Sequence, residues 1–127
     1  MSQATLITKS QAKELTRIVN NISRTLAGQS FKAPVMKLWP QYADTYSAKV
    51  PNPIDLGTIE IKLKDDMYPS IAEFRADINL LYQNSVDFNG IENIVTSAAL
   101  DVRDTFLIAI SDLEEGRSST RTSSRGL

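Results

Sequence analysis

Apolar residues recur at helical spacing from residue 95 to residue 113. The steps between them alternate between four and three residues, so their side chains share one face of a helix. A seam of this kind is typical of helices that pack into a bundle. Asn93 can cap the first turn of this helix, and Gly116 follows its last residue. The seam consists of Val95, Ala99, Val102, Phe106, Ala109 and Leu113.

A second apolar stripe lies near the start of the chain. It predicts a helix over about residues 9–27, with Gly28 as a natural stop. Thr8 and Gln11 have the spacing of a capping box at the start of this helix. The stripe consists of Leu15, Ile18, Val19, Ile22 and Leu26.

Two more helices are predicted between these stripes. Asp55 can cap a short one, and Ser70 with Glu73 forms a second capping box before a longer one. The longer helix ends near Phe88, and Gly90 suits a left-handed turn just beyond it. With no credible pair of strands, the prediction is an all-α fold of four helices. The inner faces carry Leu56, Ile59 and Leu63 on the short helix and Ile71, Phe74, Ile78, Leu81 and Ser85 on the longer one.

Residues 28–54, between the first two predicted helices, have no sustained period. So long a connection is unusual in a small domain, and such loops tend to carry function. The segment holds four prolines and a high share of apolar residues, so it must pack against the bundle or line a site. Its apolar and aromatic residues include Phe31, Val35, Leu38, Trp39, Tyr42 and Tyr46.

Composition removes several classes of function. The chain of 127 residues has no histidine and no cysteine. It therefore lacks the usual general base, the commonest zinc ligand and the nucleophile pairs that depend on histidine. No enzyme activity, metal or cofactor is expected. No apolar run approaches the length of a membrane span, and the N-terminus lacks the order of a secretory signal.

Charge is unevenly distributed along the chain. Residues 1–115 hold 11 basic and 15 acidic residues, a balance of −4, whereas residues 116–127 hold three arginines and no acid. An acidic body argues against nucleic acid as the main partner and suits basic proteins. The domain is predicted over residues 9–115, after a flexible N-terminus at 1–8 and before a disordered Ser/Thr/Arg-rich tail at 116–127.

The end of the third predicted helix carries the main chemical signal. Asn89 follows Phe88 there and faces the apolar loop. An amide in an apolar cup suits a neutral ligand with a carbonyl group better than it suits catalysis. From these residues alone, an asparagine followed by glycine is also read as a simple helix cap.

Residues 53–59 resemble the signature of a known family. The segment Pro53-Ile54-Asp55-Leu56-Gly57-Thr58-Ile59 is similar to the Pro-Met-Asp-Leu-x-Thr-Ile signature of bromodomains, which read acetyl-lysine. Tyr68-Pro69-Ser70, Asp77 and the ending around Asn84-Ser85 support the resemblance, which covers roughly residues 9–115. It implies a left-handed four-helix bundle with a long loop between the first and second helices.

The resemblance implies roles for individual residues. Asn89 takes the place of the asparagine that donates to the acetyl carbonyl, and Tyr46 that of a loop tyrosine that reaches the carbonyl through water. Phe31 and Val35 line the pocket, Phe88 stands where tyrosine is usual, and Ile94 holds the gatekeeper position. Residues expected at the rim are Pro34, Trp39 and Tyr42. The shelf reads Gln29-Ser30-Phe31, so its tryptophan is missing.

The predicted function is therefore recognition of acetylated histone tails or other lysine-acetylated proteins in the nucleus. The chain is expected to be a monomeric part of a larger chromatin-associated protein. Rim acids (Asp44, Asp87 and Glu92) favour basic tails through weak attraction. Two alternatives remain: a protein-interaction module of the same fold with a degenerate pocket, and a small carboxylate-based hydrolase.

Overall fold

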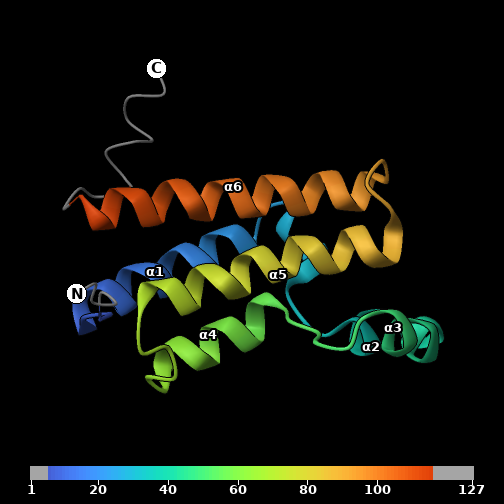
Figure 1. The fold of residues 1–127 in the computed structure, drawn as a ribbon, viewed down its shortest axis with the longest axis horizontal. Helices are drawn as coiled ribbons and strands as arrows, with labels where there is room; N and C mark the ends of the chain where they lie inside the picture. The colour runs from blue at the N-terminus through green and yellow to red at the C-terminus, as the bar shows by residue number, and fades with distance from the viewer. Residues whose placement is uncertain (1–5, 116–127) are drawn as a thin grey trace.

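The computed structural model describes residues 6–115, and within this range the chain forms helices and no strands. Residues 1–5 of the predicted flexible N-terminus (1–8) and the whole predicted disordered tail (116–127) lie outside this range. Four of these helices are long and form the bundle that can be followed in Figure 1, and the absence of strands in this range confirms the predicted all-α fold. The four long helices are α1 (Lys9–Ser23), α4 (Leu56–Lys64), α5 (Ile71–Asn89) and α6 (Ile94–Glu114).

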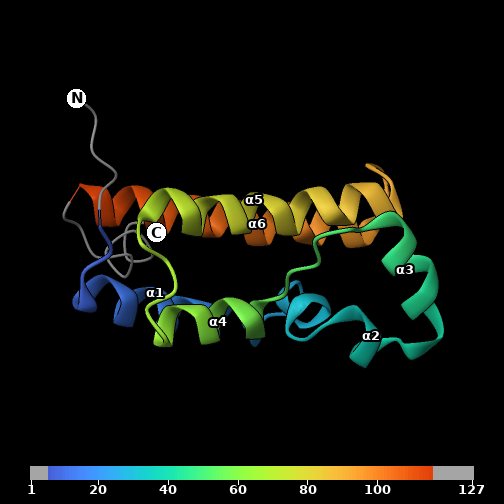
Figure 2. The ribbon, with the colours of Figure 1, turned by 60° about the horizontal axis from the view of Figure 1, so that its bottom comes forward.

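The long helices pack as two pairs. α5 and α6 run antiparallel along one side of the bundle, and α1 packs on α4 along the other (Figure 2). The apolar faces predicted for α4, α5 and α6 all meet in one core. The largest side chains that are fully buried there are Phe74, Phe106, Leu15, Leu56, Ile59, Ile71, Ile78 and Ile110.

The first helix ends about one turn earlier than predicted. α1 stops at Ser23, and Leu26 is 90% exposed instead of lying on the core stripe. Gly28 explains the early end, because a Cβ there would lie 1.9 Å from the carbonyl oxygen of Ile22. Its N–H donates to the hydroxyl of Thr25 at 2.9 Å, and that hydroxyl donates to the same Ile22 oxygen at 2.7 Å. The chain therefore turns sharply back on the helix end.

The segment predicted as a loop contains short helices. They are η1 (Gly28–Phe31), α2 (Val35–Leu38), η2 (Pro40–Tyr42) and α3 (Ala43–Lys49). None is long enough for an apolar period to emerge in the sequence. α2 and α3 lie at one end of the bundle, beyond the start of α4 and next to the C-terminal half of α5 (Figure 2).

Three of the four predicted caps are confirmed. Thr8 with Gln11 forms the capping box of α1, Asp55 accepts the N–H of Thr58, and Asn93 accepts that of Val95. The fourth is wrong: Ser70 precedes α5 but its side chain makes no capping hydrogen bond.

Gly90 follows α5 with φ of 91° and ψ of 154°. The positive φ was predicted and favours glycine. The ψ value, however, lies outside the left-handed helical region.

Two hydrogen bonds fix the ends of the segment that carries α2 and α3. The N–H of Gly57 donates to the carbonyl of Lys32 at 3.2 Å. The side chain of Asn84, which is 4% exposed on α5, donates to the carbonyl of Asn52 at 2.9 Å. Residues 32–52 are thereby held against the bundle at both ends.

A buried tyrosine makes the stability of the fold sensitive to high pH. The hydroxyl of Tyr68 donates to Asp77 at 2.6 Å, and Lys62 contacts the same carboxylate oxygen at 2.7 Å. Burial raises the pKa of Tyr68, and the bond to Asp77 raises it further. The native state therefore keeps this proton above about pH 10, where the unfolded chain has lost it.

The contribution of Tyr68 to the free energy of unfolding is accordingly expected to be fully present below about pH 10. It should decrease as the pH rises beyond that value. Urea unfolding between pH 7 and pH 11.5 measures this. Tyr68→Phe should reduce the fall, whereas Tyr42→Phe, at a position that is 49% exposed, should retain it. Identical pH slopes for Tyr68→Phe and the parent chain would contradict the prediction.

Candidate functional site

A cavity of about 260 Å³ opens between the C-terminal half of α5 and the segment of short helices. Five of the six predicted ligand contacts line it, as do two of the three predicted rim residues. The five are Asn89, Tyr46, Val35, Phe31 and Phe88, and the two are Trp39 and Tyr42.

Two predicted residues lie outside the wall of the cavity. Ile94 is 83% exposed, and the wall residue is its neighbour Val95. The reason is the phase of α6: successive residues of a helix point about 100° apart, and Val95 belongs to the core-facing seam. Pro34 precedes α2 and positions Val35 without lining the cavity. A role for either residue in ligand binding stays a prediction.

Asn89 is the last residue of α5, and a short chain of hydrogen bonds holds its amide. Its Nδ2 donates to the hydroxyl of Ser85, one turn earlier, at 3.1 Å. That hydroxyl lies 3.1 Å from the hydroxyl of Thr96 on α6, which lies 2.6 Å from the carbonyl of Gly90. Since a primary amide has two N–H donors, one can orient Asn89 while the other serves a ligand.

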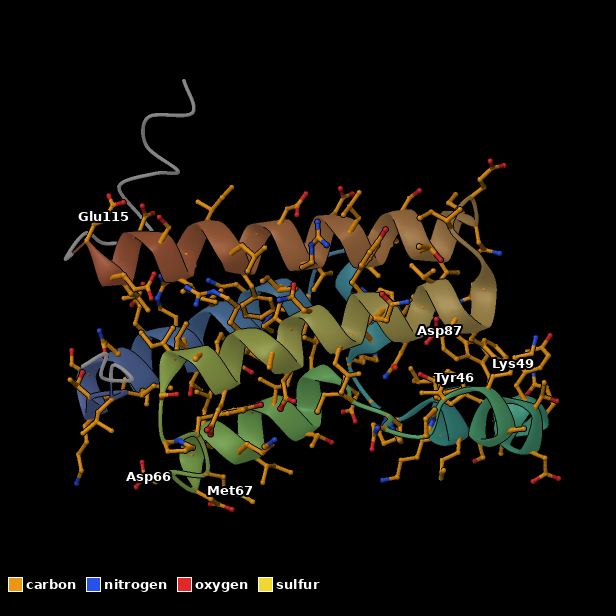
Figure 3. The ribbon with its side chains drawn as sticks, viewed as in Figure 1. Tyr46, Lys49, Asp66, Met67, Asp87 and Glu115 are labelled. Carbon is orange, nitrogen blue, oxygen red and sulfur yellow. The ribbon has the colours of Figure 1, made fainter. Side chains whose placement is uncertain are left out.

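Tyr46 lies on α3 across the cavity from α5. Its ring meets that of Phe88 edge-on, with centroids 4.9 Å apart. Figure 3 shows Tyr46 and Lys49 close to the part of α5 that carries Asp87. Burial raises the pKa of Tyr46, and the negative charge of Asp55 raises it further. A tyrosine hydroxyl is already protonated at neutral pH and can donate a hydrogen bond, and this shift keeps it protonated to a higher pH.

The wall also contains residues that were not predicted as contacts. Leu81 and Ser85 precede Asn89 by eight and four residues on α5, so the helical period alone was a sufficient signal for both. Ser30 lies in η1 and Ala33 follows it. This segment has no repeating apolar pattern from which their place in the wall could be predicted. The full set missed is Ser30, Ala33, Ile54, Asp55, Leu81, Ser85 and Val95.

The family model for the bromodomain matches residues 15–101, which is more than half of the chain. The chain belongs to the bromodomain family. The match confirms the resemblance to bromodomains that the signature around Asp55 indicated. Reading acetyl-lysine is the general function of bromodomains.

Three relatives illustrate where similar bromodomains occur. The SWR1 complex bromodomain subunit bdf1 of Schizosaccharomyces pombe is 38% identical over 96 residues, which is 76% of this chain and 16% of the relative. A bromodomain-containing protein of the same yeast, C631.02, is 32% identical over 79% of this chain and 14% of its own length. Transcription initiation factor TFIID subunit 1 of Caenorhabditis elegans is 38% identical over 50% of this chain and 4% of its own. This bromodomain thus spans a small part of the length of its relatives.

Between residues 6 and 115 the bromodomain offers neither a cluster of metal ligands nor a membrane-spanning helix. No group of acidic side chains there is arranged to hold a metal ion. No helix in that range has the length and apolar character that crossing a membrane needs.

Proposed function

We propose that this bromodomain binds acetyl-lysine, with Asn89 donating a hydrogen bond to the acetyl carbonyl. The observation that carries the proposal is the amide of Asn89 at the wall of a largely apolar cavity, oriented by Ser85. Tyr46 contributes a protonated hydroxyl to the same cavity and is placed to anchor a water that bridges to the carbonyl.

Charge provides the discrimination between acetylated and free lysine. Moving an ammonium group into an apolar cavity costs several kcal/mol unless a counter-charge compensates. Acetylation removes that charge and leaves a carbonyl that needs one donor. Asp55 also lines the cavity, where its carboxylate caps α4: its two oxygens accept the N–H and the hydroxyl of Thr58 at 3.0 and 2.7 Å.

The partners in this proposal are acetylated histone tails or other acetylated nuclear proteins, and the location is the nucleus. Asp44, Asp87 and Glu92 are exposed, which suits attraction to basic tails. Relatives that belong to the SWR1 complex and to TFIID support a chromatin or transcription setting. In this proposal the chain acts as a monomeric module of a larger protein and catalyses no reaction.

Titration of the ¹⁵N-labelled protein with histone-tail peptides tests the proposal. Peptides with acetylated lysine should shift the resonances of Asn89, Ser85 and Val35, with a dissociation constant on the order of 10 μM to 1 mM. Unmodified peptides of the same sequence should leave these resonances in place. Equal shifts with both peptides would refute selective reading of the acetyl group.

One observation favours a second candidate, a protein-interaction module whose pocket no longer binds acetyl-lysine. Gln29 stands where the family's shelf has tryptophan, and it is exposed and does not line the cavity, whereas Ser30 and Phe31 of the same shelf segment do. A folded protein that shows no acetyl-dependent shifts at millimolar peptide would favour this candidate over the reader.

A further inference from the structure

Glycine follows asparagine at one place in the chain, Asn89-Gly90. The chain has seven asparagines, and the other six precede larger residues. An asparagine can lose its side-chain nitrogen when the main-chain nitrogen of the next residue attacks the carbon of the side-chain amide. A side chain on that next residue hinders the attack, and glycine has none. Of the seven, Asn89 is therefore the asparagine that sterics protect least.

We propose that Asn89 undergoes spontaneous deamidation and that this change ends acetyl-lysine recognition. The nitrogen of Gly90 gives up its proton and bonds to Cγ of Asn89, and the side-chain nitrogen leaves with that proton as ammonia. Water then opens the five-membered succinimide at either carbonyl, which gives aspartate or isoaspartate. The net reaction consumes one water, releases one ammonia and changes no oxidation state. The loss of recognition rests on the proposed function, whereas the covalent change does not.

Three hydrogen bonds hold the reacting groups in the folded protein. The N–H of Gly90 donates to the carbonyl of Val86 at 2.9 Å, and Nδ2 of Asn89 donates to the hydroxyl of Ser85 at 3.1 Å. The carbonyl of Gly90 lies 2.6 Å from the hydroxyl of Thr96. The nitrogen of Gly90 can attack only after its bond to Val86 opens. Because Asn89 is the last residue of α5 and Gly90 is exposed, this opening is the fraying of a helix end and leaves the core intact.

Other asparagines lack this combination of an open successor and a helix end. Asn52 precedes Pro53, whose nitrogen carries no proton and cannot attack. Asn84 is almost fully buried, and its amide donates to a main-chain carbonyl. Asn79 is exposed but lies in the middle of α5, where it precedes Leu80. Asn89 should therefore react before them.

Deamidation removes the group on which the proposed recognition depends. A carboxylate has no N–H, so it cannot donate to the acetyl carbonyl. It also adds a negative charge to a cavity whose wall includes Asp55. Isoaspartate in addition inserts a methylene into the main chain and displaces what remains of the side chain. Bound acetyl-lysine opposes the reaction, because it engages the amide of Asn89 and keeps the end of α5 closed.

Incubation of the whole chain at 37 °C and pH 8, followed by mass spectrometry of its proteolytic peptides, tests the covalent change. A synthetic peptide with the sequence of residues 84–94 gives the rate in an open chain. Asn89 should gain one dalton before any other asparagine, at a rate between about 5 and 100 times below that of the peptide. A slower rate than this range, or earlier modification of another asparagine, overturns the inference alone.

A variant tests whether opening of the helix end controls the rate. Thr96→Val keeps the shape of the side chain and removes the hydroxyl that contacts the carbonyl of Gly90, so deamidation should be at least threefold faster. Thr105→Val, at an exposed position on the same helix, is the matched control and should leave the rate unchanged. Equal rates in the two variants would refute control by these hydrogen bonds.

The link to recognition has its own readouts. An acetylated histone-tail peptide at five times its dissociation constant should slow deamidation about sixfold, since only the free protein reacts. The unmodified peptide should leave the rate unchanged. Deamidated protein, separated by ion exchange, should bind the acetylated peptide at least fivefold more weakly than fresh protein does.

The outcomes separate this inference from the proposed function. Equal binding by deamidated and fresh protein overturns the loss of recognition, although fresh protein still reads acetyl-lysine. The same holds if the acetylated peptide gives no protection. If fresh, folded protein shows no acetyl-dependent shifts, the proposed function fails and the loss of recognition fails with it.

Discussion

Asn89→Ala is expected to remove acetyl-lysine binding while leaving the fold intact. The substitution deletes the donor for the acetyl carbonyl, and the carbonyl then enters the cavity without that partner. Leaving such a group unsatisfied costs about 1–3 kcal/mol, or roughly a 5- to 150-fold loss of affinity. Starting from about 0.1 mM, the middle of the expected range, the dissociation constant rises to roughly 0.5–15 mM. Peptide titration followed by NMR measures the effect.

Two companion variants separate the role of the donor from other effects of the change. Asn89→Asp keeps the shape of the side chain and removes both N–H donors, so it should lose binding as fully as Asn89→Ala does. Asn79→Ala changes an exposed asparagine on the same helix and should bind like the parent chain. If Asn89→Asp retains parental affinity, the donor role is refuted and Asn89 serves only as part of the wall.

Phe106→Ala is expected to cost about 3–5 kcal/mol of unfolding free energy, which is much of the roughly 5–15 kcal/mol of a typical domain. The ring is fully buried on α6 and meets that of Phe74 at 5.8 Å, and Phe74 in turn meets Tyr68 at 5.4 Å. Removing it leaves a cavity beside the packed pair of Phe74 and Tyr68. The melting temperature should fall by roughly 10–25 °C, as measured by circular dichroism.

The control for this prediction lies two residues along the same helix. Ile108 is 53% exposed, and isoleucine and phenylalanine have similar helix propensities. Ile108→Ala therefore matches the backbone effect of Phe106→Ala without opening the core, and should stay within about 0.5 kcal/mol of the parent. Equal losses in the two variants would mean that Phe106 contributes no packing energy of its own.

The long helices could be predicted because their buried faces repeat over several turns. Val102, Phe106 and Ala109 are all buried, as the spacing along α6 required. α2 and α3 escaped prediction because they have only four and seven residues, too few to define a face. The end of α1 also escaped, since it depends on the close approach of Gly28 to Ile22, a tertiary detail with no periodic signal.

Part of the candidate site could likewise be predicted from the sequence, and part could not. Leu81, Ser85 and Asn89 follow one another at helical spacing, and the seam itself favoured Val95 over Ile94 for an inward position. The bond between Ser85 and Thr96 joins two helices, and no pattern within either helix predicts that pairing. Ser30 and Ala33 reach the wall only because the chain around η1 folds back against the bundle.

The two bonds that hold residues 32–52 have an evolutionary consequence. On the side of this segment, both use main-chain oxygen atoms, those of Lys32 and Asn52. Every amino acid has the same main-chain acceptor, so neither hydrogen bond restricts the amino-acid sequence of residues 32–52. The side chains of this segment, several of which line the cavity, can therefore change without loss of either attachment to the four long helices.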